Sequence, residues 1–378
     1  MTRATRRRTR RGESGGADPS ARDRAELSHR LRAWYRTARR DLPWRRDPGA
    51  YRVWVSEIML QQTRVATVVP YFERWMRRFP SVAALARADE DEVMSLWQGL
   101  GYYSRARSLR EGARHVVERH EGRIPDGVTE LLDLPGVGPY SAAAIASIAF
   151  GRRVPVVDGN VVRVLCRVFG LRGDPRTMPL KGRIGQLADD LVPAGAAGEH
   201  NQAMMELGAT VCTPRAPACV ACPLAARCVA RRDGVVERLP ELPARARPTA
   251  LGMVAGLVWR RGRLLLARPT TRARWWNGLW QLPNGELGRG ESGAAAAIRV
   301  VRDVASLELR TVTWRARERH SVTRFRIDLD AFEGSAPAGR ARAKEGFVLA
   351  WKRPVELEQV GLPAPHRRLL RRLVTERG

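Results

Sequence analysis

Lysine is nearly absent from this chain of 378 residues: Lys181, Lys344 and Lys352 are the only three, so arginine supplies almost all of the positive charge. Long apolar runs are missing as well. The longest run of small apolar residues, from Ser141 to Phe150, is far shorter than a membrane span and is followed by two arginines. We therefore expect no transmembrane helix.

The first 26 residues contain no Leu, Ile, Val or Phe, although six of the first eleven are arginine. A transit peptide needs an apolar helix face, which this composition cannot supply. We see no signal peptide either, and we expect a cytoplasmic, nucleoid-associated protein of the bacterial type that is not secreted. Residues 1–24 are predicted to be a basic, disordered tail that touches DNA.

The chain carries a formal net charge of +28 and a sequence pI near 11.4. Such an excess of positive charge favours a polyanionic partner, either nucleic acid or an acidic membrane surface. Arginine enrichment together with many alanines can also reflect codon bias. The charge therefore supports nucleic-acid binding without establishing it.

Two kinds of sequence texture divide the chain. Residues 25–232 show helical periodicity broken by short Pro- and Gly-containing turns, with no strand pattern and no internal repeat. Residues 233–249 include the Pro- and Arg-rich stretch LPELPARARP and are predicted to be a linker. Residues 250–378 combine strand patterns at 253–259, 263–267 and 325–330 with a helix at 294–304. We predict an all-α region followed by an α+β domain.

The helical region contains a turn that could bind an anion. Gly136 and Gly138 allow a tight turn, Pro139 suits the first position of a helix, and Gly151 ends that helix. Free backbone amides at a helix N-terminus bind phosphate. Asp158 precedes a second helix, predicted over 161–169, where free amides favour an ionised carboxylate. An ordinary helix–helix turn and a simple cap are the plain alternatives.

Glu57 lies in the segment YRVWVSEIMLQQT, a predicted helix over about 51–63, among apolar residues. Burial disfavours the charged form, so this carboxyl would have a raised pKa and could act as an acid near neutral pH. A desolvated acid such as Glu57 and a hydrated carboxylate such as Asp158 form a pair suited to cleaving a bond to a sugar. The alternative is a structural glutamate at the edge of the core, paired with an arginine.

Four of the five cysteines fall in one short segment. Cys212, Cys219, Cys222 and Cys228 are spaced C-x6-C-x2-C-x5-C, which suits either an iron–sulfur cluster or zinc. Metal binding outranks disulfides because we see no export signal. Cys166 stands apart and is predicted to be a buried, small hydrophobic residue.

The cysteine spacing, LPGVGPY (134–140) and VVDGN (156–160) together resemble the helix-hairpin-helix DNA glycosylases related to endonuclease III. The segments LPWR (42–45), SEIMLQQT (56–63), WQGLGYYSRAR (97–107) and NQAMMELGA (201–209) resemble the adenine DNA glycosylases of that superfamily, the MutY family. The likeness covers about Ala25 to the C-terminus. It implies a helix-hairpin-helix over 132–150, a 4Fe–4S loop over 212–228 and double-stranded DNA as the partner of a monomer.

The resemblance also implies an activity: removal of adenine mispaired with 8-oxoguanine or guanine, with the adenine flipped out of the duplex. Glu57 would protonate adenine at N7, and Asp158 would stabilise the oxocarbenium ion. The remaining implied site residues fall into three groups, which position the sugar, line the base pocket and enter the duplex beside the lesion: Tyr140 and Asn160; Arg45, Gln202 and Glu206; Gln62, Thr63 and Tyr102. Tyr140 replaces the lysine with which bifunctional relatives cleave the strand, so we predict a monofunctional enzyme.

Residues 250–378 resemble a MutT-like (Nudix) domain that reads the lesion. Gly285, Glu291, Arg299 and Asp303 keep the spacing of a Nudix box, but Val300 and Val304 replace two metal-binding acids. We expect no Mg²⁺-dependent pyrophosphate hydrolysis. The family's Phe-Ser-His lesion motif becomes Val322-Thr323-Arg324 here, in which Thr323 keeps the hydroxyl.

Three other functions remain open from the sequence. One is a glycosylase for mismatched thymine or oxidised pyrimidines, against which the second domain and the stretch GLGYYSRAR argue. Another is a nucleotide-pool hydrolase with a DNA-binding appendage, which the broken Nudix box opposes. The third is a non-catalytic iron–sulfur DNA-binding protein. A zinc deaminase is disfavoured because no His-x-Glu precedes the cysteine pair.

Overall fold

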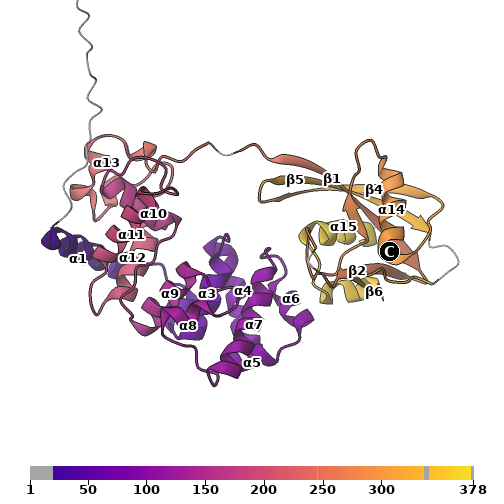
Figure 1. The fold of residues 1–378 in the computed structure, drawn as a ribbon, viewed down its shortest axis with the longest axis horizontal. Coiled ribbons are helices and arrows are strands. Elements are labelled where there is room, and N and C mark those ends of the chain that lie inside the picture. The colour runs from indigo at the N-terminus through magenta and orange to yellow at the C-terminus, as the bar shows by residue number, and fades with distance from the viewer. Residues whose placement is uncertain (1–19, 245, 272, 336–339, 376–378) are drawn as a thin grey trace, which may run out of the picture. The chain divides into compact units, whose positions relative to one another are not determined.

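The structure is a computed structural model that describes residues 20–244, 246–271, 273–335 and 340–375 (Figure 1). The chain forms two compact units. The first unit comprises Met1–Trp54, Asp126–Asp133 and Val137–Ala244, and the second comprises Val55–Pro125, Leu134–Gly136 and Arg245–Gly378. The helical region therefore contributes to both units, and the domain boundaries expected at residues 24, 232 and 249 stay a prediction.

Helices are the only regular secondary structure among the described residues of the first unit, and its core lies between α1, α10, α11 and α12. Its apolar centre includes Leu31, Leu165, Ile184 and Leu207, each at most 2% exposed. The helices of this unit are α1 (Ala21–Ala38), α2 (Pro43–Arg46), the start of α3 (Ala50–Leu60), α8 (Val128–Leu132), α9 (Pro139–Phe150), α10 (Gly159–Val168), α11 (Leu180–Leu191), α12 (Ala197–Thr210), α13 (Val229–Arg232) and the short 3-10 helices η1 (Cys219–Ala221), η2 (Ala225–Arg227) and η3 (Val236–Arg238).

Helix α1 begins earlier than the apolar periodicity indicated. A capping box starts it: the Ser20 hydroxyl accepts a bond from the Asp23 amide, and the Asp23 carboxylate accepts one from the Ser20 amide. These bonds satisfy amides that would otherwise have no partner at a helix start. Residues 20–24, predicted as part of the tail, therefore open the helix. Residues 1–19 of the predicted tail lie outside the described residues.

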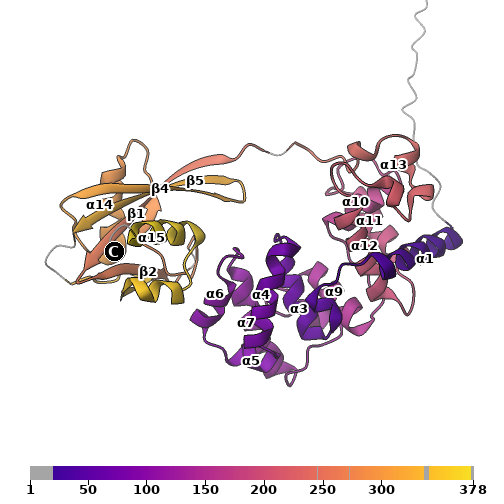
Figure 2. The same cartoon turned by 180° about the vertical axis from the view of Figure 1, so that it is seen from behind.

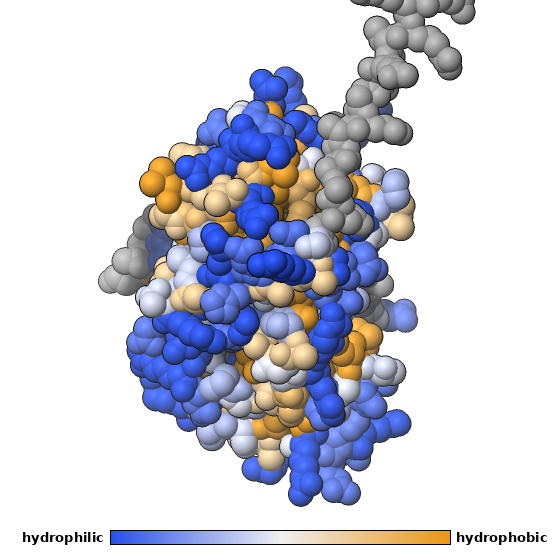
Figure 3. Space-filling model, turned by 90° about the vertical axis from the view of Figure 1, so that its left-hand side faces the viewer, coloured by the Kyte–Doolittle hydropathy of each residue, from blue (hydrophilic) through white to orange (hydrophobic). Residues whose placement is uncertain are grey.

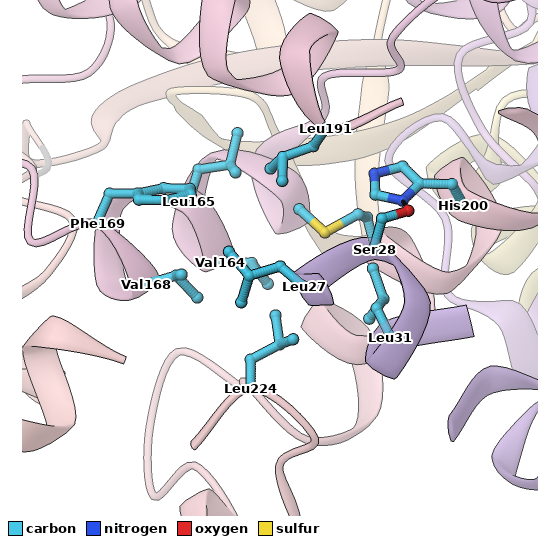
Figure 4. Close-up of a pocket in the computed structure, with 11 residues that line it drawn as sticks. Leu27, Ser28, Leu31, Val164, Leu165, Val168, Phe169, Leu191, His200 and Leu224 are labelled. Atoms are coloured by element: carbon cyan, nitrogen blue, oxygen red, sulfur yellow. Dashed lines mark hydrogen bonds between the residues drawn. The ribbon is translucent and has the colours of Figure 1, made fainter. Parts of the chain in front are cut away.

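A small apolar cavity lies in the core of the first unit, between α1, α10 and α12 (Figure 4). One polar pair borders it: the Ser28 hydroxyl and His200 Nδ1 lie 2.9 Å apart. Burial, with a smaller contribution from Arg32, lowers the pKa of His200 to about 4, so the ring is neutral at pH 7. The cavity belongs to the packed interior of the helical bundle.

The second unit contains the remaining helices of the N-terminal half. Among them, Trp75 packs edge-to-face on Phe79 and Trp97, with ring centroids 5.1 and 5.5 Å apart. These helices are the end of α3, α4 (Val65–Arg78), α5 (Val82–Arg87), α6 (Glu90–Trp97) and α7 (Ser104–Arg119). Helix α3 stops at Leu60, short of the predicted residue 63, because Gln62 adopts a left-handed conformation with φ of 56°.

The second unit also contains a mixed β-sheet with the strand order β4-β5-β1-β2-β6, and β3 pairs with β1 (Figure 2). Strands β1 and β5 are parallel, and the other pairs are antiparallel. The strands are β1 (Thr249–Arg260), β2 (Arg263–Pro269), β3 (Asn284–Glu286), β4 (Val312–Val322), β5 (Phe325–Ser335) and β6 (Phe347–Lys352). All strands of the described residues lie in the predicted α+β domain, apart from Thr249 at the start of β1, which falls at the end of the predicted linker; this confirms the predicted fold class.

Two helices cover the two faces of this sheet. Alternate residues of β1 point to opposite sides: Met253 packs in one cluster with Leu369 of α15 (Ala364–Thr375), and Val254 packs in another with Ala297 of α14 (Gly293–Ala305). The short helix η4 (Pro354–Gln359) precedes α15. The central strand β1 is thus buried on both faces of the sheet, whereas the edge strand β4 is mostly exposed.

The helices α6 and α7 contact the sheet domain within the second unit. Tyr103 Oη donates to the Leu362 carbonyl at 3.1 Å, and Arg268 Nη1 donates to Asp91 Oδ1 at 2.9 Å. Tyr103 is half-buried, whereas its neighbour Tyr102 is 43% exposed. Tyr103 is therefore bonded to the sheet domain, and Tyr102 faces solvent.

The surface is predominantly hydrophilic on the face drawn in Figure 3, where apolar patches are interspersed among charged and polar residues. No helix within the described ranges is both long enough and apolar enough to span a membrane.

Candidate active site and cysteine loop

The predicted glycine turn is present between α8 and α9. Gly136 has a positive φ of 78°, and a Cβ there would lie 2.5 Å from the Ser108 Cβ, so only glycine fits. Gly138 is the N-cap residue of α9, which starts at Pro139 and ends at the left-handed Gly151. The predictions for Pro139 and Gly151 are confirmed. Phosphate binding by this turn stays a prediction.

Asp158 is the N-cap residue of α10, and both of its carboxylate oxygens accept hydrogen bonds. Oδ1 accepts from the Val161 amide at 2.7 Å, and Oδ2 accepts from Asn160 Nδ2 at 2.8 Å. The predicted helix began at residue 161, but the N-cap bond allows it to start at Gly159. Hydrogen bonds to both oxygens fix the direction in which the carboxylate points.

Arg163 connects this carboxylate to the cysteine loop. Its guanidinium donates to Asn160 Oδ1 and to the carbonyls of Gly208 and Cys212, each at 2.7 Å. Helix α12 comes very close at this point, because a Cβ on Gly208 would lie 2.5 Å from the Asn160 Cβ. The orientation of Asn160, and through it that of Asp158, depends on helices α10 and α12 together.

Tyr140 lies in the first turn of α9 and is half-buried. Its hydroxyl donates to Met205 Sδ of α12 at 3.3 Å, and its ring packs with the cluster of Ala143, Ala144 and Val156. Val156 lies two residues before Asp158, so Tyr140 packs on the segment that leads to this carboxylate.

Arg45, Gln202 and Glu206 also come together in the first unit, around Tyr35. Arg45 Nη2 donates to Glu206 Oε2 at 2.8 Å and its guanidinium lies 5.5 Å from the centre of the Tyr35 ring. The Tyr35 hydroxyl donates to Gln202 Oε1 at 3.1 Å.

Glu206 has a fully buried side chain, and Arg40 supplies its other hydrogen bonds. Burial would raise the pKa of Glu206, but the bonds from Arg40 and Arg45 outweigh burial and hold the pKa at about 2. Glu206 is therefore a buried anion that orients Arg45, rather than a group exposed to a ligand.

Glu57, Gln62, Thr63 and Tyr102 lie in the second unit. Glu57 is 6% exposed on α3, next to Ile58 at 2%, so the predicted apolar surroundings are present. The roles of Glu57 as an acid and of Asp158 as its partner stay predictions. Gln62 and Tyr102 are both exposed and both have a positive φ, of 56° and 48°.

The four cysteines of the C-x6-C-x2-C-x5-C segment are half-buried and line one cavity with Val164, Leu207 and Val236. Arg167 is 1% exposed at this cavity and donates to Cys212 Sγ at 3.3 Å and to the Thr213 carbonyl at 2.7 Å. Among the residues that the structure describes, no three potential metal ligands meet closely around one point. The shared cavity, in which one thiol accepts a bond from a buried guanidinium, fits a multi-metal cluster held by thiolates.

Cys166 is fully buried, and burial raises the pKa of its thiol to about 11. This confirms that it is a small core residue.

In the Nudix-like segment, the polar residues that keep the spacing of a Nudix box are bonded to one another. Arg299 binds both oxygens of Glu291 at 2.7 Å, and Gly288 donates its amide to the same carboxylate. Val300 and Val304 are 3% and 5% exposed. The two positions that lack an acid are thus filled with core valines, and the expected absence of pyrophosphate hydrolysis stays a prediction.

The segment predicted to read the lesion is the tip of the β4–β5 hairpin. Val322 pairs with Phe325, and Thr323 and Arg324 form the two-residue turn. Thr323 is exposed and has a positive φ of 49°, which is unusual for a β-branched residue. The hydroxyl of Thr323 therefore lies at a solvent-facing tip, and its contact with a lesion stays a prediction.

The sequence did not point to three arginines that hold predicted site residues or the chain next to them: Arg40, Arg105 and Arg163. Each bonds main-chain carbonyls or a carboxylate far away in the sequence. In so arginine-rich a chain, no local signal distinguishes them from surface charges.

In comparisons with known proteins, two protein-family models match this chain. Residues 55–188 match the HhH-GPD superfamily of base excision DNA repair proteins, and residues 254–372 match the NUDIX domain.

The chain is also similar to curated proteins. It is 52% identical over 218 residues to the adenine DNA glycosylase of Homo sapiens, a match that covers 55% of this chain and 40% of the relative. It is 43% identical over 196 residues to that of Mycobacterium tuberculosis, covering 51% of this chain and 64% of the relative. The chain thus spans less than two thirds of the length of these relatives.

Among solved structures, a thermostable thymine-DNA glycosylase is 31% identical, with a TM-score of 0.51. The match covers 56% of this chain and 97% of that structure.

Proposed function

Because the chain belongs to the HhH-GPD superfamily of base excision DNA repair proteins and carries a NUDIX domain, we propose that it is an adenine DNA glycosylase. Its substrate would be double-stranded DNA in which adenine is mispaired with 8-oxoguanine or guanine. It would hydrolyse the bond between adenine N9 and the sugar, and it would leave an abasic site in an uncut strand.

The observation that carries this proposal is the geometry of Asp158. The Val161 amide and the Asn160 side chain hold the two carboxylate oxygens in a fixed direction, which a group needs in order to stabilise a developing oxocarbenium ion. Glu57, buried on α3, would donate its proton to adenine N7 as the glycosidic bond breaks. Water then adds to the sugar, and its proton returns to a carboxylate.

Other residues would bind the substrate. Arg45, held by Glu206 and packed against Tyr35, which donates to Gln202, would supply donors for the edge of a flipped base. Gln62, Thr63 and Tyr102 would enter the duplex at the mispair, and Thr323 at the β4–β5 turn would contact 8-oxoguanine. Tyr140 and Asn160 would position the sugar and Asp158.

Cys212, Cys219, Cys222 and Cys228 would hold a 4Fe–4S cluster, since the four thiols line one cavity beside Arg167. When bound, the cluster would tie together the loop that follows α12. The chain's own contribution is the bond from Arg163 to the Cys212 carbonyl, which connects this loop to Asn160. Purified protein should be brown and contain iron and sulfide; a colourless protein with stoichiometric zinc would contradict the cluster.

The test is base release from four duplexes that carry A opposite 8-oxoguanine, A opposite G, T opposite G, or A opposite T. Alkali converts each abasic site into a strand break. We expect breaks at adenine in the first two duplexes only. Glu57→Gln and Asp158→Asn should each lower the rate by at least about a hundredfold, yet still bind the A:8-oxoguanine duplex.

Breaks at T opposite G, with adenine left intact, would instead favour the thymine-mismatch alternative. Lesion binding by the wild-type protein without any base release would favour a non-catalytic DNA-binding protein.

A further inference from the structure

Arg105 is the most extensively bonded side chain in the second unit among those whose bonds the structure describes. It is 9% exposed at the start of α7, and its guanidinium donates to main-chain carbonyls of two segments. The acceptors in the first segment lie in the last turn of α3 and just after it: the carbonyls of Ile58, Met59 and Gln61 and the hydroxyl of Thr63. The acceptors in the second segment precede α7: the carbonyls of Leu100, Gly101 and Tyr102.

These acceptors flank the two strained residues of this unit that we expect to meet DNA. Gln61 and Thr63 lie on either side of Gln62, and Gly101 immediately precedes Tyr102. Left-handed φ angles in residues other than glycine are unfavourable, by about 1 to 3 kcal/mol each, and persist only when the surroundings impose them. One guanidinium bonds the chain around both residues, and it also lies 5.5 Å from the centre of the Tyr102 ring.

The chemistry of this contact requires arginine. All acceptors that Arg105 reaches among the described residues are neutral oxygens. Burial lowers the pKa of Arg105 to about 10, so the group is still protonated at pH 7. A planar guanidinium with five N–H groups can serve both segments at once, whereas a lysine ammonium offers three donors from one point.

We propose that Arg105 is a positioning residue for mispair recognition, which holds Gln62 and Tyr102 in the conformations in which they enter the duplex. The inference rests on the proposed function, because it assigns to these two residues the recognition of a mispair. Arg105 itself need not touch DNA. Its loss should weaken discrimination between mispaired and matched duplexes more than it weakens the fold.

The matched control is Arg110, one turn further along α7. It is also 9% exposed, and its Nε donates to the Ala88 carbonyl at 2.8 Å, away from Gln62 and Tyr102. In a Glu57→Gln background, which removes base release, the measured quantity is the affinity ratio between an A:8-oxoguanine duplex and an A:T duplex. We expect Arg105→Lys to lower this ratio by roughly tenfold and Arg110→Lys to change it by less than about twofold.

A double-mutant cycle separates positioning from general destabilisation. If Arg105 acts through the two exposed side chains, Arg105→Lys should have no further effect on the ratio once Gln62 and Tyr102 are both alanine. If Arg105→Lys lowered the affinity ratio equally with the native Gln62 and Tyr102 and with alanine at both positions, the inference would be overturned. Should Arg105→Lys fail to fold, Thr63→Val removes one acceptor while keeping the guanidinium, and an unchanged ratio in that folded variant would overturn it as well.

Adenine release by the wild-type protein separates a failure of this inference from a failure of the proposed function. No adenine release by the wild type from the A:8-oxoguanine duplex would refute the proposed function. Adenine release by the wild type, together with a wild-type affinity ratio in folded Arg105→Lys, would refute the role of Arg105 alone.

Discussion

Glu206 shows how a single buried residue can depend on its partners. Its side chain is fully buried, and Arg40 and Arg45 bond both of its oxygens. The folded-state pKa of about 2 lies below the usual value of 4.5. A depressed pKa contributes stability that is complete above the unfolded value and is lost as the pH falls through the folded one. The contribution of Glu206 should therefore decline between about pH 4.5 and pH 2.

We predict that Glu206→Gln lowers the free energy of unfolding by about 3 kcal/mol at pH 7, because two arginines lose their shared anion. The difference from wild type should shrink below pH 4.5. Urea unfolding across this pH range measures both effects. Glu199→Gln on the same helix is the control: Glu199 bonds Arg36 at the surface, and its loss should cost no more than about 1 kcal/mol. A pH-independent loss in Glu206→Gln would contradict this account.

Tyr140 occupies the position at which a lysine would make a strand-cleaving enzyme. Its hydroxyl is bonded to Met205, and it has no amine with which to attack the sugar. We predict that borohydride traps no covalent complex between the wild-type protein and lesion DNA, and that strand breaks appear only after alkali. Tyr140→Lys should yield a trapped complex under the same conditions. Trapping of the wild-type protein would show that another amine, such as Lys181, reaches the abasic site.

At the scale of elements, the close crossing of α12 with α10 determines the shape of the site. Gly208 leaves no room for a side chain against Asn160, which binds Asp158. Gly208→Ala should therefore displace Asn160, lower the free energy of unfolding by about 1 to 3 kcal/mol and slow base release. Thermal unfolding and single-turnover kinetics measure the two effects.

The control for this change is Gly185→Ala on α11. A Cβ at Gly185 meets nothing within 4 Å. Alanine there should stabilise the protein by about 0.5 to 1 kcal/mol, because glycine is a poor residue for a helix interior. Base release should be unchanged. If both substitutions changed the free energy of unfolding in the same direction, the close crossing of α12 with α10 would not explain the effect of Gly208→Ala.

At the scale of the whole molecule, the net charge of +28 predicts that the affinity for duplex DNA depends strongly on salt concentration. If arginines neutralise six to ten phosphates, affinity for undamaged duplex should fall by roughly a thousandfold or more between about 50 and 200 mM salt. Base release from a preformed complex should depend much less on salt, since Glu57 is buried and Asp158 is half-buried. Fluorescence anisotropy at several salt concentrations gives the slope. A slope near zero would favour codon bias as the origin of the arginines.

The sequence by itself determined the features that depend on neighbouring residues. The turn at Gly136 and Gly138, the start of α9 at Pro139, the cap at Asp158 and the spacing of the four cysteines are all set by local chain chemistry. The change from helical to strand periodicity near residue 250 likewise predicted two kinds of fold, because the period of apolar residues differs between helix and strand.

The tertiary structure alone decided the features that join distant parts of the chain. Arg45 and Glu206 are 161 positions apart, and Arg105 bonds the Ile58 carbonyl 47 positions away. The left-handed conformations of Gln62 and Tyr102 have no local signal either, since neither is a glycine. Such features depend on which surfaces become buried together, and burial is a property of the packed chain rather than of any short segment.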